Sequence, residues 1–267
     1  MRNLSEAFDL SGRVAIVTGG GSGIGAASAR LLADAGGAVI VGDIREDKAR
    51  EVAHDIQSEK GNALGQAVDV RQKSQVDALV DRAMKEFGQL DVMVNNAGIP
   101  IDCPLTETSE ELLENGLAVK AKGTFFGCQA AMRVMIPRRS GSIVNVSSGS
   151  IDNPYAGSTV YAMSNAASAM LTRTLAVEAG PYGIRVNAIA PGLTLTPFVE
   201  RRQVDAEGRP DPEGFAAFIS TLRDQSPLGL VGAPEDQAYL ILYLASDVSR
   251  FMTGTILRAN GGIVLPW

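Results

Sequence analysis

The feature that most constrains the fold is a glycine-rich turn near the start of the chain, between an apolar run and a helical pattern. The turn follows the apolar run Arg13–Thr18 and reads Gly19-Gly20-Gly21-Ser22-Gly23-Ile24-Gly25. Glycines here permit a tight bend and a close backbone approach, and the free N–H groups of the next helix can bind a pyrophosphate. The turn therefore predicts a dinucleotide-binding unit, although a turn that only needs positive φ angles gives the same pattern.

The rest of the chain alternates short β-branched runs with longer segments of helical periodicity. The predicted strands are Arg13–Thr18, Ala38–Asp43, Ala63–Asp69, Leu90–Asn95, Ser142–Ser147, Ile184–Ala190 and Ile256–Ala259. The predicted helices are Ile24–Ala35, Lys48–Ser58, Gln72–Phe87, Ser109–Met135, Val160–Ala179 and Pro234–Ala245. This alternation predicts one α/β domain over residues 1–267, a doubly wound parallel sheet (Rossmann fold) of about seven strands with helices on both faces.

One segment, residues 193–232, departs from this rhythm and is rich in proline, glycine and charged residues. Loops of this length are uncommon unless they are functional or disordered. We predict a small helical lid over a binding site, with Phe215, Phe218 and Ile219 as its apolar face. The alternative is a mobile surface excursion.

An acidic residue, Asp43, ends the second predicted strand, 18 positions after Gly25. A carboxylate at this place accepts hydrogen bonds from the adenosine ribose and repels a 2′-phosphate, so Asp43 favours NAD over NADP. Arg45 lies close by and could soften this preference. The alternative is that Asp43 only caps the helix that follows.

Composition excludes several classes of partner. The chain has 24 Lys+Arg against 30 Asp+Glu, a net charge of −6, and no basic cluster, which argues against nucleic acid. Cys103, Cys128 and the single His54 form no metal-binding constellation, and two unpaired cysteines suit a reducing cytoplasm. No stretch approaches the roughly 20 apolar residues that span a bilayer. We therefore predict a soluble cytoplasmic protein without metal, membrane or nucleic-acid partners.

Five motifs occur in order along the chain: TGGGSGIG (18–25), NNAG (95–98), IVNVSS (143–148), RVNAIAPG (185–192) and TGTILRANGG (253–262). They resemble the signatures of the classical short-chain dehydrogenase/reductase family, including its TGxxxGxG, NNAG and TGxxLxVDGG segments. The resemblance implies hydride transfer between a nicotinamide cofactor and a small-molecule substrate, interconverting a secondary alcohol and a ketone. It also implies a homotetramer, assembled partly through the helix that bears Tyr161.

The resemblance assigns cofactor contacts from the pyrophosphate and adenosine to the nicotinamide. Backbone around Ser22–Ile24 holds the pyrophosphate, Asp69 and Val70 meet the adenine, and the segment 191–196 reaches the carboxamide. The full implied set is Gly19, Ser22, Gly23, Ile24, Gly25, Asp43, Asp69, Val70, Asn96, Ala97, Gly98, Tyr161, Asn165, Pro191, Gly192, Thr194 and Thr196.

The implied catalytic group consists of Ser148, Tyr161, Lys120 and Asn165, and two of its members depart from the family. Ser148 and Tyr161 match the serine and the tyrosine. The family's YxxxK, however, reads Tyr161-Ala162-Met163-Ser164-Asn165, and its VNxKG reads Val119-Lys120-Ala121-Lys122-Gly123. Lysine and asparagine have exchanged places. A free phenol titrates near ~10, so the tyrosine needs a nearby cation to act near neutral pH.

We hypothesise that Lys120 brings its ammonium into the same pocket and lowers the pKa of Tyr161 by on the order of 1–3 units. Asn165 can still bind ribose hydroxyls but carries no charge. One alternative is a decayed or repurposed site with Lys120 on a solvated helix face, in a catalytically silent dinucleotide-binding protein. Another is elimination or isomerisation with NAD held throughout. A second tyrosine, Tyr155, is predicted to line the pocket.

Overall fold

The computed structural model describes residues 4–200, 209 and 211–265. Its centre is a seven-stranded sheet in the order β3-β2-β1-β4-β5-β6-β7, and every neighbouring pair is parallel. The strands are β1 (Val14–Thr18), β2 (Ala38–Asp43), β3 (Asn62–Ala67), β4 (Val92–Asn95), β5 (Gly141–Val146), β6 (Ile184–Ile189) and β7 (Ile256–Leu257). The predicted doubly wound sheet is confirmed, with the third strand ending two residues before the predicted Asp69.

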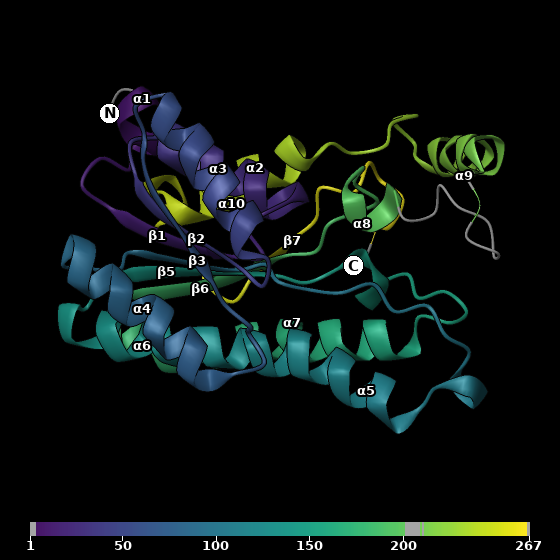
Figure 1. Ribbon diagram of the computed structural model, residues 1–267, viewed down its shortest axis with the longest axis horizontal. Coiled ribbons are helices and arrows are strands. Elements are labelled where there is room, and N and C mark those ends of the chain that lie inside the picture. Colours follow the sequence, from purple (N-terminus) through teal and green to yellow (C-terminus); the bar gives the residue numbers. More distant parts are fainter. Residues whose placement is uncertain (1–3, 201–208, 210, 266–267) are drawn as a thin grey trace.

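Helices cover both faces of the sheet (Figure 1). On one face lie α1 (Leu4–Phe8), α2 (Gly23–Asp34), α3 (Glu46–Ser58) and α10 (Pro234–Ala245), and on the other lie α4 (Lys73–Phe87), α5 (Glu110–Leu117), α6 (Gly123–Arg138) and α7 (Thr159–Ala179). Short 3₁₀ helices are η1 (Leu105–Glu107), η3 (Gly149–Ile151), η4 (Gly180–Tyr182) and η6 (Asp247–Ser249). No helix of the described chain is long and apolar enough to cross a membrane.

Each face of the sheet has its own apolar core. Ile16 of β1 belongs to one core, and its neighbour Val17 belongs to the other. Successive side chains of a strand point to opposite faces, so a strand covered on both sides is buried at every position and is mostly apolar. All five residues of β1 are accordingly buried.

The strand order fixes where a ligand can bind. The chain builds β1, β2 and β3 in one direction and then returns to place β4 on the other side of β1. Ligands of doubly wound sheets usually bind at such a reversal, in a crevice outside the carboxyl ends of the strands. The glycine-rich turn and the NNAG segment follow β1 and β4, and both therefore border this crevice.

The predicted helix Ser109–Met135 is not one continuous α-helix. It is divided into α5, a π-helical turn at Ala118–Lys122, and α6. A π-turn inserts one residue into the helical ladder and rotates the side chains that follow, a distortion frequent at functional sites. Lys120 lies in the middle of this turn, so the prediction of an uninterrupted helix was wrong at its most consequential position.

The segment 193–232 contains α8 (Pro197–Glu200) and α9 (Pro212–Gln225), and residues 201–208 and 210 lie outside the described residues. Figure 1 shows α8 beyond the carboxyl ends of the strands and α9 farther out. Phe215, Phe218 and Ile219 form a half-buried row along α9, and the rings of Phe215 and Phe218 have centroids 6.4 Å apart. The helical content matches the expectation, and the role of a lid stays a prediction.

Candidate active site

The glycine-rich turn is packed so tightly that side chains cannot replace its hydrogens. A Cβ atom on Gly25 would lie 2.1 Å from the carbonyl oxygen of Gly19. Helix α2 begins at Gly23, and the side chain of its N-cap residue, Ser22, makes no capping hydrogen bond. Among the described residues no side chain caps the first N–H groups of α2, so they can bind an anionic group such as a pyrophosphate.

We expect Gly25→Ala to weaken dinucleotide binding and to destabilise the fold. The added methyl must displace the turn or α2, and overpacking of this kind costs about 1–3 kcal/mol or more. For a chain of this size that lowers Tm by several degrees, measurable by thermal denaturation. Gly180→Ala is the matched control, because a Cβ there meets nothing within 4 Å. Equal Tm values for the two variants would contradict the tight approach at Gly25.

Asp43 supports the same turn. Its side chain is buried; Oδ2 accepts a hydrogen bond from the Gly21 N–H at 3.0 Å, and Oδ1 accepts one from the Arg45 N–H at 3.0 Å. Arg45 is itself the N-cap residue of α3, so Asp43 does not cap the free N–H groups of that helix. Each carboxylate oxygen keeps a lone pair for a further donor. The Arg45 guanidinium reaches Ser22 Oγ at 3.3 Å along the rim of the turn.

The NNAG segment locks the end of β4 to the turn. Asn96 Nδ2 donates to the carbonyl oxygens of Thr18 and Gly19, at 3.1 and 3.0 Å. Farther along the same edge, Val70 is buried, while the carboxylate of Asp69 is held by Arg71, whose hydrogen bonds lower the pKa of Asp69. The structure thus gathers the residues predicted for the adenosine half at one edge of the sheet.

The segment 191–196, after β6, lies at the part of the site predicted for the nicotinamide half of the cofactor. The Pro191 carbonyl accepts from the Gly149 N–H at 2.8 Å, which joins this segment to the loop after β5. A Cβ on Gly192 would lie 2.5 Å from the Cα of Asn260, so only glycine fits there. Thr196 is buried and contacts the turn of β1 at Gly23, where a Cβ would be 3.0 Å from its methyl carbon.

Ser148 and Tyr161 lie on either side of the loop that joins β5 to α7. Ser148 is the N-cap residue of η3, and its Oγ accepts a hydrogen bond from the Ser150 N–H at 3.1 Å. Tyr161 lies in the first turn of α7, and its ring packs against that of Phe198 on α8 with centroids 5.8 Å apart. Both side chains are half-buried, so a ligand can reach them.

Asn165, at the position where the resemblance implies a lysine, is buried and turns back onto its own helix. Its Nδ2 donates to the Tyr161 carbonyl at 2.9 Å, and its Oδ1 has no hydrogen-bond donor in the described chain. A buried acceptor without a donor is costly. A hydroxyl group of a bound ribose is a donor of the right kind.

Lys120 is buried, with 6% of its surface exposed. Its Nζ donates to the Ala97 carbonyl at 3.2 Å and lies 3.7 Å from the position of a Cβ on Gly98. No carboxylate of the described chain pairs with this ammonium, and burial lowers the pKa of Lys120 to about 8. The alternative that placed Lys120 on a solvated helix face is therefore excluded: the lysine reaches the backbone of the NNAG segment.

Sequence reasoning missed one polar residue at this edge, Gln237 of α10. Its Nε2 donates to the Ala259 carbonyl at 2.8 Å and to Thr194 Oγ1 at 3.3 Å, and its side chain is buried. It thereby ties the segment predicted to meet the carboxamide to the end of β7. The sequence shows only a glutamine that follows Glu235 and Asp236 at the start of a helical pattern, and this does not reveal its partners.

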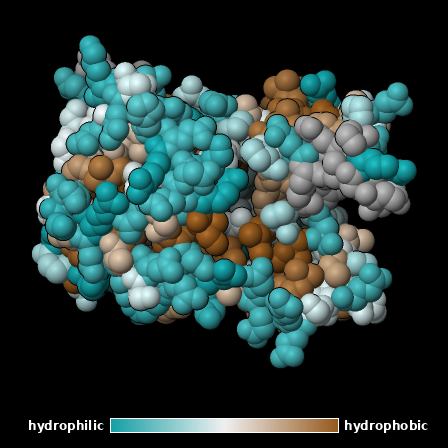
Figure 2. Space-filling model, in the orientation of Figure 1, coloured by the Kyte–Doolittle hydropathy of each residue, from teal (hydrophilic) through white to brown (hydrophobic). Residues whose placement is uncertain are grey.

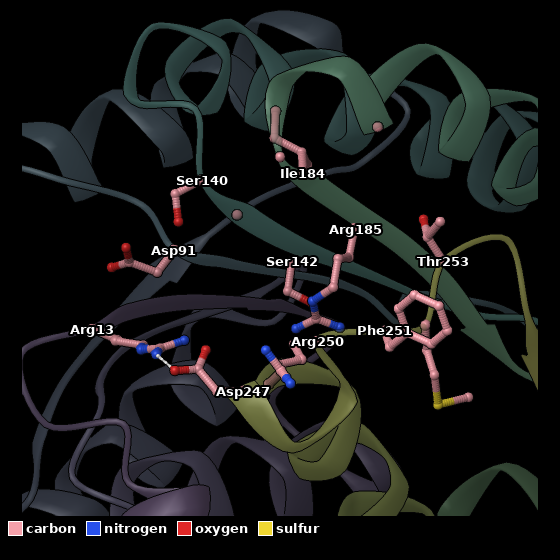
Figure 3. A pocket seen from close by; sticks show the side chains of 15 residues that line it. Arg13, Asp91, Ser140, Ser142, Ile184, Arg185, Asp247, Arg250, Phe251 and Thr253 are labelled. Carbon is pink, nitrogen blue, oxygen red and sulfur yellow. Dashed lines mark ion pairs between the residues drawn. The ribbon is translucent and has the colours of Figure 1, made fainter.

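A pocket of about 680 Å³ lies at the opposite edge of the sheet, where β5 and β6 begin (Figure 3). Arg13, Arg185 and Arg250 line it, and Arg13 forms an ion pair with Asp247 at 2.8 Å. The implied catalytic residues do not line it. Because ligands of doubly wound sheets bind at the carboxyl ends of the strands, this pocket is not the candidate active site.

Comparison with known proteins agrees with this geometry. The family model described as "Enoyl-(Acyl carrier protein) reductase" matches residues 19–264. The chain is 41% identical over 260 residues to 3beta-hydroxysteroid dehydrogenase 1 of Eggerthella lenta, covering 96% of this chain and 95% of that protein. It is 40% identical over 262 residues to cis-4-hydroxycyclohexanecarboxylate dehydrogenase of Sinomonas cyclohexanicum, covering 97% and 98%.

A solved structure shows the same likeness in three dimensions. A short-chain type dehydrogenase/reductase from Mycobacterium marinum superposes with a TM-score of 0.89 at 34% identity, covering 99% of this chain and all of that one. The extent of these matches and the order of the five motifs agree along the chain. The protein therefore belongs to the classical short-chain dehydrogenase/reductase family of oxidoreductases.

Proposed function

We propose that the protein is an NAD-dependent oxidoreductase that interconverts a secondary alcohol and a ketone, with Tyr161 as the general acid–base. The observation that carries the proposal is the buried Lys120 ammonium beside Ala97 and Gly98. It supplies a cation at the sheet edge that also holds Ser148 and Tyr161, although the family's lysine position is occupied by Asn165.

The residues present fit a dinucleotide. The N-terminus of α2 lacks a side-chain cap, Asp43 presents two carboxylate oxygens at the end of β2, and Asn165 Oδ1 is a buried acceptor in need of a donor. When bound, the nicotinamide accepts or donates the hydride. Asn165 would then accept a hydrogen bond from a hydroxyl group of the nicotinamide ribose, at the position where the family's lysine donates to that ribose.

Proton transfer falls to Ser148 and Tyr161. Because Ser148 Oγ accepts from the Ser150 N–H, its own proton is left to donate to the substrate oxygen. In the oxidation direction the Tyr161 phenolate takes the hydroxyl proton of the alcohol, and in the reduction direction the phenol returns a proton to the oxygen of the ketone. A cation nearby favours the phenolate and brings its pKa toward operating pH. Lys120 is the residue we assign to that role.

We propose NAD rather than NADP because of Asp43, and we expect Asp43→Ser to reduce or reverse the preference. Losing charge-assisted hydrogen bonds of about 1.5–3 kcal/mol should lower kcat/KM for NADH by about 10- to 100-fold. Removing the repulsion should improve the use of NADPH, helped by Arg45. Steady-state kinetics with both cofactors would measure the ratio.

The matched control for Asp43 is Glu46→Ser. Glu46 is an exposed acid on the neighbouring helix that pairs only with Arg50 among the described residues. It should leave the preference unchanged. An unaltered ratio in Asp43→Ser would remove Asp43 from the proposed ribose contact.

We further propose a cytoplasmic homotetramer. Met163, Met170 and Val177 lie seven residues apart on α7 and are 45%, 56% and 77% exposed, and Phe125 of α6 is 48% exposed. Seven-residue spacing places side chains on one face of a helix. An exposed apolar row of this kind supports an interface through the helix that bears Tyr161.

The proposed substrate is a small or medium-sized, largely uncharged alcohol or ketone. Figure 2 shows hydrophobic residues gathered near the centre of the visible face, between hydrophilic surfaces above and below. The names of the two relatives refer to a hydroxysteroid and a hydroxycyclohexanecarboxylate. Cyclic ketones therefore belong in any substrate panel.

The experiment that tests the function follows NADH oxidation by absorbance against a panel of ketones and diketones, with NADPH in parallel. Turnover with stoichiometric NADH consumption supports the proposal and excludes isomerisation with retained cofactor. Absence of turnover across the panel, with NADH binding confirmed by fluorescence, would instead support a silent dinucleotide-binding protein. The dehydrogenase names of the relatives and the presence of Ser148 and Tyr161 favour the enzyme.

A further inference from the structure

An ion pair joins the end of β7 to the loop that carries the implied catalytic serine. Arg258 Nε donates to Asp152 Oδ2 at 2.6 Å, and its second terminal nitrogen donates to Asp152 Oδ1 at 3.0 Å. The two residues are 106 positions apart, and their side chains are only 22% and 14% exposed. Paired hydrogen bonds between a guanidinium and a carboxylate fix orientation as well as distance, and screening by solvent is reduced when the pair is mostly buried.

The loop held by this ion pair, residues 149–158, connects Ser148 to the helix that bears Tyr161. On one side it is tied to the segment after β4, because the Cys103 N–H donates to the Gly157 carbonyl at 2.9 Å. On the other side Asp152, directly after η3, is held by Arg258. The loop between the two side chains is therefore anchored near both of its ends, in addition to the direct bond from Ser147 Oγ to the Asn165 carbonyl at 3.0 Å.

Arg258 is itself held firmly. Its remaining terminal nitrogen donates to the Ile256 carbonyl at 2.7 Å, so all three of its guanidinium nitrogens have protein partners. The next residue, Ala259, is bound through its carbonyl to Gln237 of α10. The hydrogen bond with Asp152 also raises the pKa of Arg258. Three of the five N–H donors of Arg258 are thus engaged within the protein, and these bonds fix the orientation of the guanidinium.

We propose that Arg258 is a positioning residue: through its paired hydrogen bonds with Asp152 it fixes the loop 149–158, and so sets the places of Ser148 and Tyr161 relative to the substrate oxygen. The inference rests on the proposed function for its catalytic consequence, but not for its structural one. In this role Arg258 acts through Asp152 and η3 and contacts neither substrate nor cofactor.

The kinetic test compares Arg258→Met with the wild type. Misplacement of catalytic groups by about 1 Å can cost about 100-fold in rate, so we expect kcat to fall about 10- to 100-fold. The Kd for NADH, measured by fluorescence, should stay within about twofold, since the cofactor contacts lie elsewhere. Arg258→Lys keeps the charge but loses the planar guanidinium that makes two parallel hydrogen bonds, so its kcat should lie between those of Arg258→Met and the wild type.

A double substitution distinguishes an effect transmitted from Arg258 through Asp152 from a loss of kcat caused by lower stability. If Arg258 acts through Asp152, then Arg258→Met/Asp152→Asn should be no slower than the worse single variant. Arg30→Met is the matched control, because it removes a surface ion pair with Asp55 at 2.7 Å that lies between α2 and α3. The proposal would be overturned if the double variant lost kcat by the product of the two single losses. It would also be overturned if Arg258→Met had a normal kcat.

Hydrogen exchange tests the same inference without any turnover. In Arg258→Met we expect faster amide exchange, by about tenfold or more, within residues 149–158, with α3 and α4 unchanged. If the wild-type chain shows no activity, the proposed function fails while this measurement still decides the role of Arg258. Unchanged exchange in the loop would overturn the positioning role even in an active enzyme.

Discussion

Replacing Tyr161 with phenylalanine is expected to lower kcat by about 10²–10⁴-fold, the range that general acid–base catalysis contributes. The variant loses only the phenolic oxygen and keeps the ring that packs against Phe198. The Kd for NADH should stay within about twofold, because the oxygen that receives and returns the proton is not needed to hold the adenosine half. Steady-state rates with any ketone found in the panel, together with NADH fluorescence, would measure both quantities.

The control for this substitution is Tyr239→Phe. Tyr239 is 60% exposed on α10, on the opposite face of the sheet from α7, and its variant should turn over at the wild-type rate. A Tyr161→Phe enzyme with wild-type kcat would show that another group carries the proton. A loss of NADH binding in parallel with kcat would assign Tyr161 to cofactor binding alone.

Replacing Lys120 with methionine should impair catalysis through the pKa of Tyr161. Without the ammonium, the phenolate loses its stabilising cation, and the rising limb of the pH–rate profile for alcohol oxidation should move up by about 1–3 pH units. At pH 7 the rate should fall by a corresponding factor of about 10 to 10³. Initial rates between about pH 6 and 10 would give the shift. Lys120→Ala should displace the profile in the same direction.

The same substitution should raise the free energy of unfolding. A lysine kept for catalysis lowers stability when it is buried, whereas a lysine kept for structure raises it. Burial lowers the pKa of Lys120 from 10.5 to about 8, so at pH 7 the folded protein carries a charge that its surroundings disfavour. Between these two pKa values the unfolded chain binds more protons than the folded one, so wild-type stability rises with pH. Lys120→Met should therefore raise the free energy of unfolding at pH 7 by on the order of 1–3 kcal/mol, and Tm should rise with it. The stability difference between the variant and the wild type should shrink above about pH 8.

Lys122→Met is the matched control for both measurements, because Lys122 is exposed in the same π-helical turn. It should change neither the pH–rate profile nor Tm appreciably. An unshifted pH–rate profile in Lys120→Met would contradict the compensating cation. A lower Tm at pH 7 would instead indicate that Lys120 stabilises the crevice through its hydrogen bond to Ala97.

The fold could be predicted in detail because its signals are local. Continuous apolar runs such as Val14–Val17 and Val39–Val41 require burial on both faces, and the turn between β1 and α2 has no room for side chains. The motif around Ser148 and the spacing to Tyr161 lie in one stretch of chain, so both residues could be named as candidates from the sequence. The exchange of lysine and asparagine could also be recognised by position.

By itself the sequence determined the parallel sheet and its glycine-rich turn and named candidates for the site, since each depends on periodicity or on neighbours a few positions away. Only the tertiary structure decided where their polar groups lie. The contact of Lys120 with Ala97, the lack of a donor for Asn165 Oδ1 among the described residues, and the pairing of Arg258 with Asp152 all depend on elements far apart in the chain. Hydrophobic periodicity does not reveal one residue inserted into a helix. It also does not predict which distant backbone carbonyl or carboxylate a buried cation will contact.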